Sequence, residues 1–289
     1  MSLIIKVPTI NDKLDDFDSL FQLWNQVTDD YLDVTFDFSE CWFLRQNAVA
    51  FLGGLARLTE SLGGKVTFNW DTLRHDIRMN LRQNGFMYAF NNDEEPWQGN
   101  SIPYRQDQES SDIINYLTND WLGRGWVAVS LLLQKTIVTT VGEIYANAFE
   151  HGRSEIGVFS CGQYYPSLRT LKLTTIDFGV GIPSNVRLFC RIDDLTASDA
   201  VKWAFQKGNT TRDKDIARGL GLDLLSKFVT MNRGSLEIFS HDGYALIDQT
   251  GETYRDRQTF FPGTLVNITL QCDESYYQRL PETDDEPLF

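Results

Sequence analysis

Polar residues recur at helical spacing in the middle of the chain, at Glu143, Asn147, Glu150 and His151. If residues 141–151 form one helix, these side chains lie at i, i+4, i+7 and i+8 and share one face. Glu143 offers a carboxylate that can act as a general base, and Asn147 offers an amide oxygen, a ligand suited to Mg²⁺. The alternative is a solvated helix face, which is the ordinary role of a polar stripe.

A second group of chemically useful residues follows an apolar run. Residues 171–177 have the pattern of a buried strand, and the strand ends in Asp-Phe-Gly-Val-Gly, with Asp177, Gly179 and Gly181 at alternate positions. Glycines allow positive φ angles and a close approach of the backbone to a ligand, while the aspartate supplies a hydrogen-bond acceptor. Taken alone, the motif is equally typical of an ordinary turn.

A third motif, Gly219-Leu220-Gly221-Leu222, leads directly into the apolar helical pattern of residues 220–231. The N-terminus of a helix presents free N–H groups and the positive end of the helix dipole, which together bind phosphate. A structural glycine pair before a helix is the alternative. The motif lacks the Lys-Ser/Thr of a phosphate-binding P-loop, and no βαβ unit precedes it as in a dinucleotide-binding fold.

The elements that must position these motifs follow from apolar periodicity. Strands are predicted at residues 33–38, 65–70, 156–160, 171–177, 235–240, 244–248 and 264–271. Helices are predicted at residues 43–62, 72–84, 112–122, 127–150, 197–205 and 220–231. Because helices precede and interrupt a sheet whose late strands can pair as hairpins, we expect a mixed α+β sandwich in the second half and a small α/β unit in the first.

The same pattern divides the chain into parts. Residues 1–90 form the small α/β unit, and residues 91–111, rich in Asn, Asp, Glu, Gln and Pro, are expected to connect it to a second domain. That domain spans residues 112–273, and residues 274–289 are expected to be a loose acidic tail.

In their order and spacing, the motifs resemble those of the GHKL ATPases, which include gyrase-type topoisomerases, histidine kinases, mismatch-repair ATPases and anti-sigma-factor serine kinases. A late strand beginning Pro262-Gly263-Thr264 extends the match, which covers roughly half of the chain. The run Glu-x-x-x-Asn-Ala-x-x-His-Gly is most similar to the anti-sigma-factor serine kinases. The resemblance implies a GHKL (Bergerat) α/β sandwich that binds ATP together with Mg²⁺.

The resemblance also implies roles for individual residues. Glu143 would be the general base, and Asn147 would bind Mg²⁺. Asp177 would accept a hydrogen bond from the adenine amino group, and Gly179 and Gly181 would shape the adenine pocket.

Further roles fall on the phosphate side of the site and on its lid. Thr264 would support the adenine site, and His151 would be either a phosphate-side contact or a histidine favoured by the helix C-terminus. Residues 182–217 would form a lid. The residues expected to contact the phosphates are Gly219, Leu220, Gly221 and Leu222, together with the lid residues Lys207, Thr210, Thr211 and Arg212.

The first unit resembles the STAS domains of anti-sigma-factor antagonists, on residues 37–48 and the strand-helix order around them. In that family the phosphorylated Ser or Thr lies near the start of the following helix. The matching positions here are Gln46 and Asn47, which cannot form phosphate esters, so phosphorylation at that position is not implied. His75 lies in a segment faintly similar to a histidine-kinase phosphoacceptor box, and we interpret it as a surface histidine.

Composition limits the functional classes. The net charge of −14 and the pI near 4.6 disfavour nucleic acid and anionic lipid as partners. The scattered cysteines show no metal or disulfide spacing, and no run approaches a membrane span, so we expect a cytoplasmic protein.

Two functional hypotheses follow. One is a signalling enzyme that hydrolyses ATP or transfers its γ-phosphate to a Ser/Thr of a separate protein docked on the STAS-like unit or the lid. The other is a nucleotide-gated interaction module with little turnover. A second copy of the chain is also a candidate partner.

Overall fold

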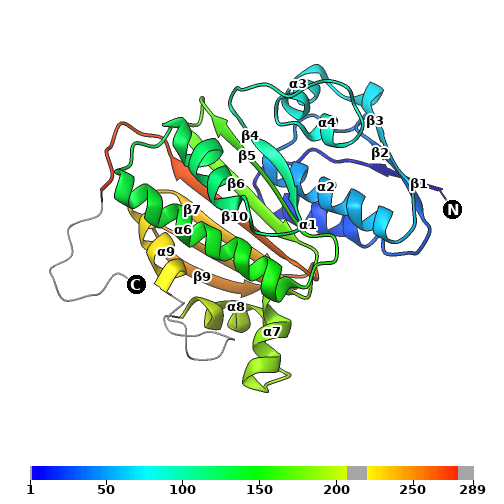
Figure 1. Cartoon of the computed structure of the whole chain (residues 1–289). Helices are drawn as coiled ribbons and strands as arrows, with labels where there is room; N and C mark the ends of the chain where they lie inside the picture. Colours follow the sequence, from blue (N-terminus) through cyan, green and yellow to red (C-terminus); the bar gives the residue numbers. More distant parts are fainter. Residues whose placement is uncertain (1, 207–219, 279–289) are drawn as a thin grey trace.

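A seven-stranded sheet forms the centre of the structure (Figure 1). The computed structural model describes residues 2–206 and 220–278. In spatial order the strands are β4 (Ser101–Asp107), β5 (Val158–Tyr165), β6 (Thr170–Asp177), β10 (Thr264–Gln271), β7 (Ser235–Ser240), β8 (Gly243–Asp248) and β9 (Gly251–Asp256). All neighbouring pairs are antiparallel. The central strands are buried on both faces, so helices must cover both.

One face of this sheet, called the front face here, carries Leu173 and Ile268. It is covered by α6 (Leu131–Asn147), which continues into the π-helical turn η4 (Ala148–Gly152), and by α9 (Leu220–Met231). The Ser130 hydroxyl caps the start of α6 by accepting a hydrogen bond from the N–H of Leu133 at 3.2 Å. The other helices of this half are α5 (Ile113–Asn115), η2 (Tyr116–Trp121), η3 (Leu122–Arg124), α7 (Gly181–Cys190) and α8 (Ala197–Phe205).

The opposite, back face is covered by the N-terminal unit. Its parallel three-stranded sheet is formed by β1 (Ser2–Lys6), β2 (Asp33–Asp37) and β3 (Val66–Asn69), joined through α1 (Leu14–Trp24) and α2 (Gln46–Ser61). Repeated β-α-β crossovers of one hand place their helices on one side of a sheet. Here α1 and α2 lie between the two sheets (Figure 1). Three short helices follow: η1 (Trp70–Thr72), α3 (His75–Gln83) and α4 (Phe86–Ala89).

The two sheets share one apolar core, and α1 and α2 fill the space between them. The Phe17 ring stacks on Phe239 with centroids 4.3 Å apart, and the Phe21 ring stacks on Phe261 at 4.9 Å. A polar contact lies beside them, where the Gln46 side-chain amide donates to Thr174 Oγ1 and Asn267 Oδ1, both at 3.2 Å. The N-terminal unit is therefore packed directly against the strands that carry the motifs.

Most predicted elements are present. Helices 197–205 and 220–231 and strands 235–240 and 264–271 have the bounds that periodicity predicts. The mixed α+β architecture is also present, with an antiparallel and a parallel sheet. Elements that periodicity did not predict are β1, α1, α4, β4, α7 and β9.

Two segments expected to be irregular are ordered. Within the expected connection 91–111, residues Ser101–Asp107 form the edge strand β4, in which Ile102 and Tyr104 are buried. Periodicity missed this strand because the two apolar residues stand in a segment that is otherwise mostly polar. At the start of the expected tail, Tyr277 is 9% exposed, and its backbone pairs with Ala128 and Ser130 at 2.8 Å. Residues 279–289 lie outside the described residues.

Among residues 2–206 and 220–278, no helix combines the length and apolar character needed to span a lipid bilayer.

Candidate functional site

Asp177 is the last residue of β6 and lies on the front face of the sheet with 3% of its surface exposed. Its Oδ1 accepts a hydrogen bond from the N–H of Gly179 at 2.9 Å. Burial raises the pKa of Asp177 to about 7, and hydrogen bonds from the backbones of Gly179 and Thr264 oppose this rise. A buried carboxyl that titrates near neutrality at the end of a central strand is typical of a ligand-binding position.

The Gly-Val-Gly turn after Asp177 packs against the end of the helix that carries the polar stripe. The N–H of Val180 donates to the carbonyl of Gly152, the last residue of η4, at 2.7 Å. A β-carbon on Gly179 would overlap that same carbonyl oxygen. Gly181 has a φ of +73°, so glycine is required at this position for conformational reasons too. Gly179 thus has no room for a side chain, and Gly181 adopts a backbone conformation that favours glycine.

The helix that carries the polar stripe therefore ends beside Asp177. Asn147 precedes Gly152 by five residues, about 7 Å along a helix axis. Glu143 and His151 are half-buried, whereas Asn147 and Glu150 are exposed. Burial, followed by the nearby Arg153, lowers the pKa of His151, which favours the neutral imidazole at pH 7.

Thr264, the first residue of β10, is the cross-strand neighbour of Asp177. Its hydroxyl lies 3.0 Å from Ser240 Oγ, and Ser240 also accepts a hydrogen bond from the N–H of Ile182 at 2.9 Å. Thr264 and Ser240 therefore tie β10 and β7 to the start of α7. The expected adenine-side residues Asp177, Gly179, Gly181 and Thr264 come together in the structure.

Three residues that brace this site were not predicted. His241 Nε2 lies 2.9 Å from the carbonyl oxygen of Val180, and Asn185 Nδ2 donates to the carbonyls of His151 at 3.0 Å and Gly181 at 3.1 Å. Ser240 is the third. Asn185 lies in a helix that periodicity missed, and His241 follows β7 with no sequence pattern to mark it, so only the folded chain reveals them.

The phosphate-side residues are described only in part. α9 begins at Leu220, as the motif predicts. Gly219 and the lid residues Lys207, Thr210, Thr211 and Arg212 lie outside the described residues, as do the side chains of positions 220–222. Among the described residues, no three or more His, Cys, Asp and Glu side chains are grouped closely enough to hold a metal ion.

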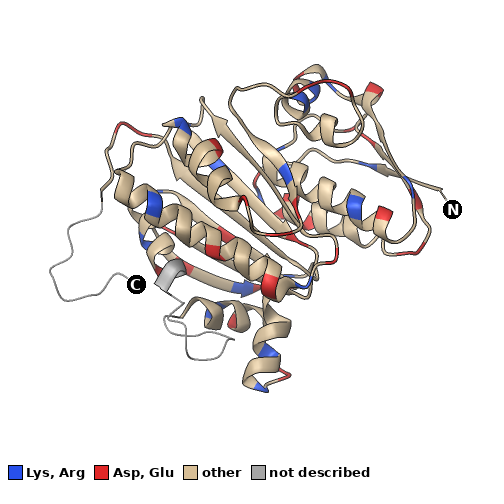
Figure 2. Cartoon of the chain, in the orientation of Figure 1, with Lys and Arg blue, Asp and Glu red and all other residues tan. Residues whose placement is uncertain are grey.

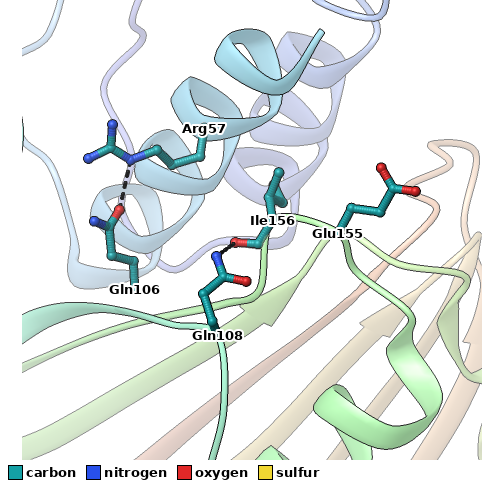
Figure 3. A pocket seen from close by; sticks show the side chains of 5 residues that line it. All are labelled: Arg57, Gln106, Gln108, Glu155 and Ile156. Carbon is teal, nitrogen blue, oxygen red and sulfur yellow. Dashed lines mark hydrogen bonds between the residues drawn. The ribbon is translucent and has the colours of Figure 1, made fainter.

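A surface depression of about 280 Å³ lies at the other face of the sheet (Figure 3). It is lined by Arg57, Gln106, Gln108, Glu155 and Ile156. The Arg57 guanidinium already donates to Gln106 Oε1 at 2.8 Å and to Glu60 Oε2 at 2.7 Å. Because its cation is occupied by these partners, this depression is a weaker candidate than the Asp177 site.

No protein-family model matches the chain, and no match is found among curated proteins. Function must therefore be inferred from the motifs and from their geometry.

Because Asp177 is buried, we expect the free energy of unfolding to depend on pH. Its pKa is raised from 3.8 in the unfolded chain to about 7 in the folded one. A raised pKa contributes stability that is complete below the unfolded value and is lost as pH rises through the folded value, at a limit of about 1.4 kcal/mol per pH unit. We therefore expect the melting temperature of the nucleotide-free wild type to fall, relative to that of Asp177→Asn, as the pH rises from about 5 to about 7. Above about pH 8 the difference between the two melting temperatures should stay constant. Parallel curves over the whole range would contradict the assigned pKa.

Proposed function

We propose that this chain is a GHKL-type signalling protein that binds Mg-ATP at the Asp177 site. The observation that carries the proposal is the meeting of three features on the front face: a buried carboxyl at the end of β6, a glycine turn packed on Gly152, and the helix that bears Glu143 and Asn147. All three belong to motifs whose order resembles that of the GHKL family.

The donor set suits an aminopurine triphosphate. Asp177 Oδ1 is held by the Gly179 N–H, which leaves the carboxylate further acceptor capacity for an exocyclic amino group. Gly152 and Gly179 carry no side chains that would cover the carboxylate. The exposed Asn147 supplies a hard oxygen for Mg²⁺, and the start of α9 supplies backbone N–H groups for phosphate.

Glu143 is the residue positioned by this helix to take a proton. In hydrolysis it would accept the proton of the attacking water, and in phosphotransfer it would accept the proton of a Ser/Thr hydroxyl on a separate protein. Mg²⁺, held with the phosphates, would neutralise charge that develops on them.

A partner protein would have to dock on a restricted part of the STAS-like unit. Gln46 and Asn47, at the positions matching the STAS phosphorylation region, are 2% and 0% exposed. Both lie at the start of α2, where Gln46 contacts the back face of the central sheet. Docking would therefore use the outer surface of this unit, or the lid.

The charge distribution supports a protein partner over nucleic acid. The net charge is −14, and in Figure 2 basic and acidic residues are interspersed along the helices and loops. Nucleic acid requires a concentrated basic surface. We place this signalling role in the cytoplasm, in keeping with the composition.

Thermal denaturation with nucleotides tests the proposal. Ligand at about 100 times its Kd stabilises a native protein by about 2.7 kcal/mol. We expect ATP with Mg²⁺ to raise the melting temperature, and GTP to raise it much less because guanine presents a carbonyl oxygen where adenine presents an amino donor. An unchanged melting temperature with every nucleotide would eliminate the proposal.

The alternative is a nucleotide-gated interaction module with little turnover. It shares the same binding site and predicts the same thermal shift. The two functions differ in the need for Glu143.

A further inference from the structure

Phe178, the residue between Asp177 and Gly179, turns away from the candidate site. Its ring packs among three aromatic rings of the back-face core, with centroid distances of 5.5 Å to Phe51, 6.0 Å to Phe159 and 5.3 Å to Phe261. All three partners are 0% exposed. The turn that holds Asp177 is therefore anchored from the opposite side of the sheet.

One wall of the Phe178 pocket belongs to the N-terminal unit. Phe51 lies on α2, and one helical turn later Gly54 faces the same ring. A β-carbon on Gly54 would overlap Phe178 Cε2 and lie 2.8 Å from its Cζ. Helix α2 can approach the turn this closely only because position 54 has no side chain.

The neighbouring glycine of α2, Gly53, faces a different aromatic ring. A β-carbon on Gly53 would lie 2.6 Å from the Cε2 and Cζ atoms of Tyr104, which belongs to the edge strand β4. Tyr104 also packs on Phe86, with centroids 5.0 Å apart. Gly53 and Gly54 are thus equally crowded, but only Gly54 touches the Asp-Phe-Gly-Val-Gly turn.

We propose that α2 is a positioning element of the nucleotide site: Gly54 and Phe51 hold the Phe178 ring, and Phe178 thereby holds the Asp177 carboxylate and the Gly179 N–H in their binding geometry. This inference rests on the proposed ATP-binding function. It assigns the N-terminal unit a direct part in nucleotide affinity, in addition to any docking role. Phe178 itself is partly buried, but the three rings that flank it are fully buried and leave no room on their side, so a methyl group at position 54 must displace the Phe178 ring and with it the adjoining backbone.

The test compares Gly54→Ala with the matched control Gly53→Ala in the full chain. Both add one methyl group to the same buried helix, so both should lower the melting temperature to a similar degree. We expect Gly54→Ala to raise the Kd for Mg-ATP about tenfold and Gly53→Ala to leave it within about twofold of wild type. Equal losses of affinity in the two variants, or no loss in Gly54→Ala, would overturn the proposal.

A second variant, Phe178→Leu, distinguishes a specific effect on the Asp177 turn from a general loss of stability. It also allows the test to be made if Gly54→Ala alone does not fold. Phe178→Leu leaves room for the added methyl group. In the Phe178→Leu background the effect of Gly54→Ala on the Kd should largely disappear, whereas the effect of Gly53→Ala should be unchanged. Additive effects in this double-mutant cycle would show that Phe178 does not carry the coupling.

A readout without nucleotide distinguishes this proposal from the proposed function. The Gly179 amide reports the turn directly, because it donates to Asp177 Oδ1. We expect its NMR signal to shift in Gly54→Ala and to stay in place in Gly53→Ala. If the wild type fails to bind ATP while the Gly179 signal behaves as expected, the nucleotide function is wrong but the α2 contact to the turn stands. A Gly179 signal unmoved by Gly54→Ala rejects the positioning role itself.

Discussion

The Asp177→Asn variant is expected to bind Mg-ATP about 100-fold more weakly than the wild type while remaining folded. Asp177 Oδ1 already accepts from the Gly179 N–H, so the ligand must use the remaining acceptor capacity. Asparagine replaces one oxygen with an NH₂ donor. That donor must face either the Gly179 N–H or the adenine amino group, and each arrangement sets two donors against each other in a buried site.

A matched control is available on the other face of the sheet. Burial raises the pKa of Glu237, whose carboxylate accepts from Asn267 Nδ2 at 2.9 Å. Glu237→Gln makes the same carboxylate-to-amide change away from the candidate site, and its ATP affinity should equal that of the wild type. Calorimetric titration of both variants is the measurement. Retention of full affinity in folded Asp177→Asn would show that the adenine assignment is wrong.

Removal of the Glu143 carboxylate should reduce turnover strongly. Proton transfer by a positioned base contributes about 100-fold or more to a reaction rate. We expect Glu143→Ala to lose about 100-fold in phosphate release or transfer from γ-labelled ATP, with little change in ATP affinity, because the residue would act on the attacking nucleophile and not on the adenine.

Glu150 provides the control for this experiment. It lies on the same predicted polar stripe but is exposed, so Glu150→Ala should leave turnover close to that of the wild type. Equal turnover in Glu143→Ala and wild type would remove Glu143 as the base. If the wild type binds ATP without measurable turnover and Glu143→Ala retains partner binding, the nucleotide-gated module becomes the better description.

The motif-bearing elements could be predicted because their patterns are local. β6 and β10 are rich in Leu, Ile, Val and Thr, and α9 begins at a glycine motif, so the positions of these elements followed from strand composition and turn chemistry. That Asp177, Gly179 and Thr264 share one site was implied by the GHKL resemblance, and the antiparallel pairing of β10 with β6 does place Thr264 opposite Asp177.

What could not be predicted depends on packing between distant segments. Residues 48–56 are apolar or glycine on every side of the helix, which indicates a helix buried between layers but does not identify the central sheet as one of them. The STAS resemblance suggested a separate domain, whereas α1 and α2 lie between the two sheets. In the motif Asp-x-Gly-x-Gly, Phe178 occupies a position where any residue is allowed, so the motif gives it no role. Its contact with Gly54, more than 120 residues earlier in the chain, appears only in the folded structure.

The position of β10 in the sheet has a consequence for how the chain assembles. Among residues 2–206 and 220–278, β10 is the last strand along the chain, yet it lies between β6 and β7 and hydrogen-bonds to both. Until residues 264–271 have been synthesised, β6 and β7 lack the strand that joins them. The back face of the sheet, on which α1 and α2 pack, is incomplete until then. Closure of the sheet is thus a late event that depends on pairings across long loops, which are slow to form. In a growing chain, the side of α1 that packs on Phe239 and Phe261 would therefore stay uncovered until the last strands of the central sheet have been made.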